Sequence, residues 1–270
     1  MTGSPRGSAP GGTGIRRGRR AALLGVGLAA SAVLGLALSW YDALPGGWRL
    51  RALFGADQSR AAEERATHRA ARLAAFEASA GGEVELLLLG SSTVERAGDS
   101  FLAAVDRRVA NRGIGDEPVA ALLERLDSML GANSSGLVVL YAGSVDARRA
   151  TGPNGSWRDV DEIVEDTAAV LDRIAAHRDG ARTLLLEVLP ETRARTPAGD
   201  RIPALNRKLL RLADERTDVR YMRTWRPPRV EAGALAGPVA ADRLHLNDAG
   251  YRTLGNWLAE DPWVRAAVRR

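Results

Sequence analysis

Two short stretches of this sequence carry side chains that could perform nucleophilic catalysis together. An apolar run, Val84–Leu89, leads into Gly90-Ser91-Ser92-Thr93, and Asp242-Arg243-Leu244-His245 lies near the C-terminus. A serine hydroxyl attacks a carbonyl when a neighbouring base removes its proton, and a carboxylate commonly orients that base. The two stretches therefore contain a nucleophile, a base and an acid to orient the base.

The chain has three histidines, and their surroundings differ. His68 lies in a charged segment before the expected folded domain, and His177 lies at the predicted end of a long helix, where histidine is a common C-terminal residue. His245 alone has a carboxylate, Asp242, three residues upstream in a loop. That spacing lets the carboxylate fix the imidazole tautomer while the other ring nitrogen faces a serine. Alone, the pair would indicate a surface ion pair or a helix cap.

The serine is expected at the end of a strand. Gly90 permits a tight turn, so Ser92 falls near the N-terminus of the next segment, where backbone N–H groups stabilise negative charge. A serine at such a turn could equally cap a helix. Ser91 is a rival nucleophile that these physical arguments leave open.

The remaining pattern shows which elements must position these residues. From Val84 onward, short apolar runs alternate with longer segments of helical periodicity. The predicted strands are Val84–Leu89, Arg108–Asn111, Leu137–Ala142, Thr183–Leu189 and Val219–Met222. The predicted helices are Ser100–Val105, Val119–Leu130, Val160–His177, Ile202–Arg216 and a last one from Asn247 to the C-terminus. This alternation predicts an α/β fold with a parallel sheet covered on both faces and a site at the carboxyl ends of its strands.

The N-terminal region reads differently from the rest. Residues 1–20 are basic and rich in Gly, Ser and Pro, so we expect them to be disordered. Residues 21–41 follow with an uncharged run of alanine, leucine, glycine and valine. They predict a transmembrane anchor or a signal peptide, with the folded domain outside the cytoplasm, or secreted if the segment is cleaved. Residues 42–82 are expected to form a linker and a juxtamembrane helix, and 83–270 the domain.

Composition excludes several classes of function. The net charge is +5, and five arginines without an acid lie within the first twenty residues, so the remainder is close to neutral. We therefore expect no nucleic-acid binding, which needs a basic patch on the folded domain. The chain has no cysteine and hence no disulfide, thiolate zinc site or cysteine nucleophile.

With these residues in place, the sequence from Val84 to Leu258 resembles the SGNH, or GDSL-type, hydrolases. The first block of that family, Gly-x-Ser after strand one, matches Ser92. Its last block, Asp-x-x-His-x-Asn-x-x-Gly-Tyr, matches Asp242, His245, Asn247, Gly250 and Tyr251. Its second block matches Asn111-Arg112-Gly113-Ile114-Gly115 and Arg125-Leu126, and its third, Gly-x-Asn-Asp, matches Gly143-Ser144-Val145-Asp146 except at Val145. Each block is short, but four in order with this spacing are specific.

The resemblance implies a flavodoxin-like three-layer α/β/α sandwich with a five-stranded parallel sheet. It also implies a serine esterase with Ser92, His245 and Asp242 as its triad, and it calls for no metal or organic cofactor. The substrates would be acyl or acetyl esters of lipids, lysophospholipids or carbohydrates. Alternatives are a weak or inactive ligand-binding relative and an acyltransferase acting on envelope polysaccharide.

Two departures concern the oxyanion hole that the resemblance implies. The family's second-block glycine, a backbone N–H donor, corresponds to Asp116, which keeps the N–H and adds a carboxylate. The third-block asparagine, a side-chain donor, corresponds to Val145, which has no donor. The backbone N–H groups of Ser92 and Asp116 would remain. Loss of one oxyanion donor typically costs about 10²–10³ in rate, which predicts a slow enzyme unless Ser144 or the 146–157 loop supplies another donor.

Overall fold

A computed structural model of the protein describes most of the chain from residue 47 onward. The described residues are 47–81, 84–132, 136–177, 180–190, 197–223, 230–231, 234–235, 240–242 and 244–267. The segments 1–20 and 21–41, predicted to be a disordered head and an anchor or signal peptide, lie outside them. Along the described ranges, no helix has the length and apolar character needed to cross a membrane. The chain divides into two compact units, Met1–Ala66 and Thr67–Arg270, and the second contains the whole sheet.

The second unit is built on a five-stranded parallel sheet, as the sequence predicts. Its strands are β1 (Leu86–Gly90), β2 (Val109–Gly113), β3 (Leu137–Tyr141), β4 (Arg182–Leu186) and β5 (Val219–Met222). They lie in the order β2-β1-β3-β4-β5, the flavodoxin-like order, and every neighbouring pair is parallel. A short hairpin of two-residue strands, β6 (Val230–Glu231) and β7 (Ala234–Leu235), was not predicted, because the sequence shows no apolar pattern there.

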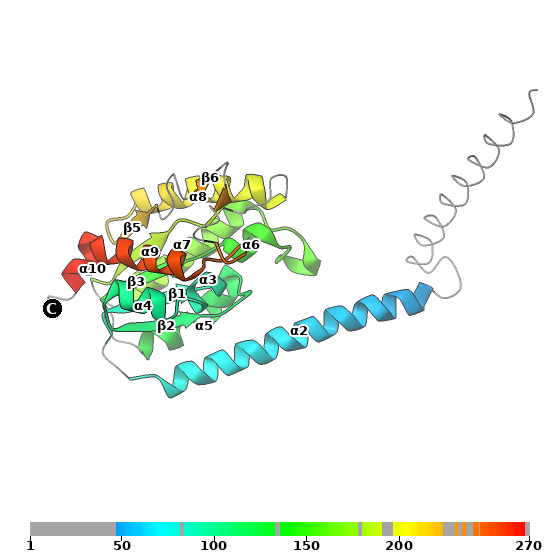
Figure 1. The fold of residues 1–270 in the computed structure, drawn as a ribbon. Coiled ribbons are helices and arrows are strands. Elements are labelled where there is room, and N and C mark those ends of the chain that lie inside the picture. Colours follow the sequence, from blue (N-terminus) through cyan, green and yellow to red (C-terminus); the bar gives the residue numbers. More distant parts are fainter. Residues whose placement is uncertain are drawn as a thin grey trace, which may run out of the picture. The chain divides into compact units, whose positions relative to one another are not determined.

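Helices cover both faces of this sheet (Figure 1). The helices of the described residues are α2 (Gly47–Ala78), α3 (Ser92–Glu95), α4 (Asp99–Val105), α5 (Val119–Gly131), α6 (Ser144–Arg148), the 3₁₀ turn η1 (Pro153–Gly155), α7 (Val160–His177), α8 (Pro197–Asp214), α9 (Asp248–Glu260) and α10 (Pro262–Ala267). Right-handed crossovers put α4 on one face, and α5, α7 and α8 on the other, because the chain reverses direction across the sheet after β2. Accordingly α5 contacts α7, α7 contacts α8, and α4 contacts α9. The three-layer α/β/α fold is confirmed.

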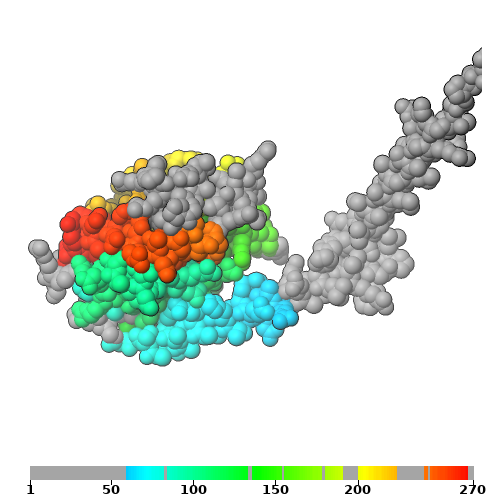
Figure 2. Space-filling view, in the orientation of Figure 1, coloured from blue at the N-terminus to red at the C-terminus, as the bar shows by residue number. Residues whose placement is uncertain are grey.

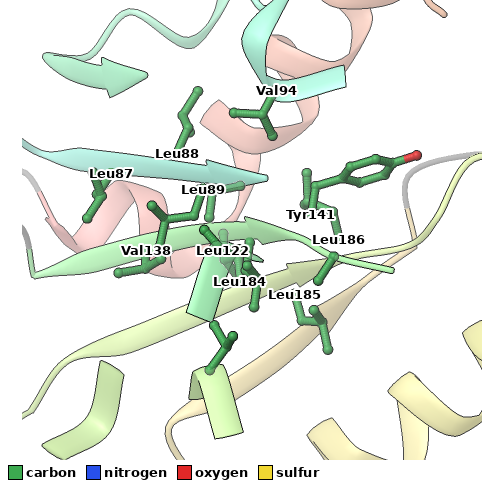
Figure 3. Packing of buried hydrophobic residues seen from close by; sticks show 14 of the residues in the cluster. Leu87, Leu88, Leu89, Val94, Leu122, Val138, Tyr141, Leu184, Leu185 and Leu186 are labelled. Atoms are coloured by element: carbon green, nitrogen blue, oxygen red, sulfur yellow. The ribbon is translucent and has the colours of Figure 1, made fainter. Parts of the chain in front are cut away.

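The strands are continuous apolar runs because the sheet is covered twice. All residues of β1 and β3 are buried. Leu87 and Leu88 point to opposite sides of the sheet, and Val94 of α3 lies beyond the end of β1 (Figure 3). Burial of each such side chain contributes about 1.5–3 kcal/mol before the entropy cost of ordering it. This core holds the carboxyl ends of β1, β2 and β3 in register.

The C-terminal helix differs from the prediction. Asn247 is its N-cap, as expected, and the Asn247 Oδ1 accepts the Gly250 N–H at 2.9 Å. The helix does not continue to the C-terminus, because Pro262 has no backbone N–H to donate and begins the separate helix α10. The helix predicted from Ile202 begins earlier, at Pro197.

The helix before the sheet is longer than the predicted 58–80 segment, since it begins at Gly47. From Thr67 onward it belongs to the compact unit that contains the sheet. Phe76 is 3% exposed, which fits a helix packed on the domain rather than a free stalk. Residues 67–78 lie against the segment around β2 and α5 (Figure 2).

Candidate active site

Side chains far apart in the sequence meet at the carboxyl end of β1. The His245 Nε2 lies 3.1 Å from the Ser92 Oγ, and the His245 Nδ1 lies 2.8 Å from the Asp242 Oδ2. The carboxylate can therefore hold the proton on Nδ1, which leaves Nε2 free to accept the serine proton. Residues separated by 153 positions thus form one hydrogen-bonded chain.

The position of Ser92 depends on the end of β1, where the backbone at Gly90 lies very close to the backbone at Tyr141. A Cβ atom at Gly90 would lie 2.5 Å from the Tyr141 carbonyl oxygen, so only glycine fits there. The chain then turns, and α3 begins at Ser92, with Ser91 at its N-cap position. The Ser91 Oγ instead lies 2.9 Å from the Ser144 Oγ, and both hydroxyls are buried. Ser92, and not Ser91, faces His245.

The loop that carries His245 is closed on itself. Ala240 and Leu246 form an isolated antiparallel bridge, and the Ala241 N–H donates to the His245 carbonyl at 2.9 Å. The following residue, Asn247, caps α9 and also donates to the Ala240 carbonyl. This short closed loop leaves the imidazole little freedom.

Asp242 accepts three hydrogen bonds from the residues that follow it. The backbone N–H groups of Leu244 and His245 each donate to its Oδ1 at 2.7 Å, and the imidazole contacts its Oδ2. Burial acts to raise the pKa of Asp242, but these hydrogen bonds outweigh burial and lower the pKa to about 2. The carboxylate thus stays charged beside the imidazole, although its side chain is 51% exposed.

The other two histidines lie elsewhere. The His68 Nε2 contacts the Glu95 Oε1 at 2.8 Å, and His177 is the last residue of α7. Of the three histidines, all within the described residues, only His245 reaches Ser92.

The loop after β2 presents Asp116 in an unusual conformation. Asp116 has φ 59°, in the left-handed region that glycine prefers. Among the hydrogen bonds of the described residues, none uses the backbone N–H of Asp116 or of Ser92 as donor. The Asp116 carboxylate pairs with the Arg149 guanidinium at 2.9 Å, and both side chains are about half exposed. The added negative charge therefore has a cation beside it.

Val145 is the second residue of α6 and is 9% exposed. The residues on either side of it, Ser144 and Asp146, make hydrogen bonds to other parts of the fold. The Ser144 hydroxyl is engaged with Ser91, and the buried Asp146 carboxylate accepts the Val119 N–H at 3.0 Å and the Thr151 hydroxyl at 2.8 Å. Ser144 thus has a partner other than a developing oxyanion, and Asp146 fastens α6 to the start of α5.

Sequence reasoning matched Tyr251 to a motif without finding what it does. Its hydroxyl donates to the Thr93 carbonyl at 2.9 Å, which ties α9 to the turn that carries Ser92. Burial raises the pKa of Tyr251, so the hydroxyl stays protonated and remains a donor. Its fixed position six residues after His245 was the feature of the sequence that could have indicated a role at the site.

A cavity of about 630 Å³ borders the His245 loop but does not include Ser92 in its lining. Its walls are Arg96, Ala241, Leu246, Asn247, Asp248, Ala249 and Tyr251. Over the part of the chain that is described, no group of three or more His, Asp or Glu side chains could hold a metal ion.

Comparisons with known proteins identify the family and the fold of this chain. Residues 79–253 match the model of the GDSL-like lipase/acylhydrolase family. No curated protein matches the sequence. A GDSL-like lipase from Bacteroides thetaiotaomicron has a similar structure, with a TM-score of 0.57 and 20% identity, over 68% of this chain and 88% of that one. An acetylxylan esterase from Geobacillus stearothermophilus has a TM-score of 0.52 and 19% identity, over 69% of this chain and 98% of that one. At these identities the likeness concerns the fold.

Proposed function

The chain belongs to the GDSL-like lipase/acylhydrolase family and is an ester-hydrolysing enzyme, and we propose that Ser92, His245 and Asp242 carry out the hydrolysis. The observation that carries this proposal is the hydrogen-bonded chain from the Ser92 Oγ through both imidazole nitrogens to the Asp242 carboxylate, at 3.1 and 2.8 Å. Such a chain is the arrangement that activates a serine hydroxyl.

The reaction proceeds in two half-reactions. The Ser92 Oγ bonds to the ester carbonyl carbon while the His245 Nε2 takes the hydroxyl proton. The tetrahedral intermediate collapses, its C–O bond to the alcohol breaks, and the imidazolium returns the proton to the departing alcohol. Water then attacks the acyl-enzyme with His245 again as base, which releases the carboxylic acid and restores Ser92. Asp242 keeps the imidazole oriented and stabilises its positive charge.

The oxyanion is held by two backbone donors in this proposal. The N–H of Ser92 stands at the start of α3, and the N–H of Asp116 projects from the loop after β2. Backbone N–H groups fixed before the reaction stabilise a developing oxyanion without reorganisation. Val145 supplies no third donor, so the enzyme works with a reduced oxyanion hole.

The substrates that we propose are acyl or acetyl esters of a lipid or a carbohydrate. Structural neighbours named as a lipase and as acetylxylan esterases support this class. We also propose that the enzyme acts outside the cytoplasm, at the membrane or after export. Support comes from the arginine-rich residues 1–20 and the apolar run that follows them.

The test is covalent labelling of the full chain by a fluorophosphonate, beside turnover of p-nitrophenyl acetate, butyrate and decanoate. The label forms a bond between the Ser92 Oγ and phosphorus, with loss of fluoride and transfer of the serine proton to His245. We expect one label, on the peptide that contains Ser92, and none in Ser92→Ala. Ser91→Ala is the matched control and keeps its label, whereas labelled or active Ser92→Ala protein would overturn the proposal.

The Asp116–Arg149 ion pair yields a further prediction. Arg149→Ala leaves the Asp116 carboxylate without its cation near the developing oxyanion, so kcat should fall about three- to tenfold, as Coulomb repulsion across a partly exposed site allows. Steady-state ester hydrolysis measures the effect. The double variant Asp116→Gly/Arg149→Ala should recover the lost rate, because glycine removes the charge and suits φ 59°. An equal loss in the single and double variants would assign Arg149 a role other than charge compensation.

A further inference from the structure

A polar cluster outside the triad holds the loop that presents the Asp116 N–H. Its centre is Glu95, the last residue of α3 and three residues after Ser92. The Glu95 side chain is 17% exposed, so its carboxylate interacts mainly with protein groups. One oxygen, Oε2, accepts the backbone N–H of Gly115, the residue immediately before Asp116. Glu95 thus connects the helix that begins at Ser92 with the loop that carries the second proposed oxyanion donor.

Helix α2 supplies the nitrogen groups that contact Glu95. The Glu95 Oε1 lies 2.8 Å from the His68 Nε2 and 3.4 Å from the Arg72 Nε. Arg72 also donates twice to the Gly113 carbonyl, at 3.1 and 2.9 Å. Two backbone groups of this loop are therefore connected to α2. The Gly113 carbonyl accepts hydrogen bonds from Arg72 directly, and the Gly115 N–H is connected to α2 through Glu95.

The loop is also anchored beyond Asp116. The buried Glu117 carboxylate accepts hydrogen bonds from two nitrogens of Arg125, and the Arg125 Nε lies 2.9 Å from the Glu117 Oε1. The Arg69 Nε of α2 lies 3.5 Å from the same Glu117 oxygen. Asp116 is thus held between fixed neighbours on both sides. Such bracing is needed because a left-handed non-glycine residue is less stable than the extended or helical alternatives.

Residues 67–78 of α2 are packed against the rest of the unit that contains the sheet. The Phe76 ring is buried, and the guanidinium carbons of Arg72, Arg112 and Arg125 lie 4.8, 5.2 and 5.7 Å from its centroid. A guanidinium over an aromatic ring is attracted by the quadrupole of that ring. Gly113 adds a close approach, since a Cβ atom there would lie 2.3 Å from the Glu95 backbone nitrogen. Residues 67–78 of α2, helix α3 and the loop therefore pack closely together.

We propose that Glu95 is a positioning residue that, with His68 and Arg72 of α2, holds the Gly113–Glu117 loop so that the Asp116 N–H faces the oxyanion. The proposal rests on the proposed function. It makes residues 67–78, which precede the part of the chain that matches the family, a component of the catalytic unit. Their contribution acts on the transition state, because the oxyanion forms only there.

The experiment compares Glu95→Ala, Glu95→Gln and Glu124→Ala in the full chain. Glu95→Ala removes the acceptor of the Gly115 N–H, so kcat should fall roughly 10- to 100-fold, the range for a displaced oxyanion donor, with KM changed less than about twofold. Glu95→Gln keeps an acceptor oxygen and should recover most of the rate. Glu124 is the matched control, because it faces Arg69 only across an exposed pair of 3.9 Å. Amide hydrogen exchange over residues 111–118 should accelerate in Glu95→Ala alone.

Two results would overturn the positioning role. One is a folded Glu95→Ala protein with wild-type kcat, and the other is an equal loss of kcat in Glu95→Gln and Glu95→Ala. If Glu95→Ala does not fold, Arg72→Met serves instead, since it keeps the aliphatic length beside Phe76 and removes both bonds to the Gly113 carbonyl. Its kcat should fall several-fold, and an unchanged kcat would refute the proposal. Fluorophosphonate labelling of Ser92 in the wild type separates these results from failure of the triad itself.

Discussion

Replacing His245 with alanine is expected to lower kcat for ester hydrolysis by about 10⁴- to 10⁶-fold, the range measured when the base of a serine triad is removed. The variant removes the imidazole nitrogen that lies 3.1 Å from the Ser92 Oγ and accepts its proton. KM should change little, since the lost interaction operates in the transition state. The measurement is steady-state hydrolysis of p-nitrophenyl acetate by the full chain.

His177→Ala is the matched control for this experiment. His177 ends α7 and has no part in the hydrogen-bonded chain to Ser92, so kcat should stay at the wild-type value. A small loss in His245→Ala, of less than about tenfold, would mean that another group removes the serine proton. In that case the 3.1 and 2.8 Å contacts would be structural rather than catalytic.

Replacing Val145 with asparagine is expected to raise kcat by about 10²-fold, the amount that one oxyanion donor usually contributes. Val145 is the second residue of α6 and lies two positions after Gly143, whose φ of 83° sets the turn at the end of β3. The two side chains differ little in size, so the turn should keep its shape. Steady-state kinetics of wild type, Val145→Asn and Val145→Ala measure the gain, and alanine should not produce it because it has no donor.

The same variant carries a stability cost that can be measured separately. Val145 is 9% exposed, and an amide left without partners there would lower the free energy of unfolding by about 1–3 kcal/mol. Urea unfolding of Val145→Asn and Val145→Ala gives this cost. A stable Val145→Asn protein with no gain in kcat would show that the side chain at 145 does not reach the oxyanion, and that two backbone donors form the complete hole.

Much of the architecture could be predicted because it follows from periodicity. Continuous apolar runs such as Leu137–Ala142 have to be buried on both faces, and the only regular way to do so with intervening helices is a parallel sheet. The predicted elements were wrong where hydrophobic periodicity gives no information. Pro262 divides the last helix without changing its apolar spacing, and the β6–β7 hairpin is too short to show alternation.

The meeting of Ser92 and His245 was also predictable, since Ser92 follows β1 at the carboxyl edge of the sheet and Asp242 and His245 match the last block of the family whose first block contains Ser92. The choice between Ser91 and Ser92 came from the family motif alone, because physical arguments on the residues left it open. Neighbouring residues at a turn point in different directions, and the packing of Ser91 against Ser144 shows which hydroxyl is turned away from the imidazole. Likewise, nothing along the chain links Asp116 to Arg149, because their ion pair depends on how two loops lie beside each other.

The sequence by itself determined the fold class, the order of the four motifs and the loss of the side-chain donor at Val145. Each of these depends only on hydrophobic pattern along the chain or on the type of one residue. Tertiary structure alone decided how the site is held. Nothing in the sequence marks Glu95 or Arg72 as a site residue, yet they contact the loop at Gly115 and at Gly113. Such contacts join residues distant along the chain through side chains of no repeating pattern, so they exist only once the sheet has brought α2, α3 and that loop together.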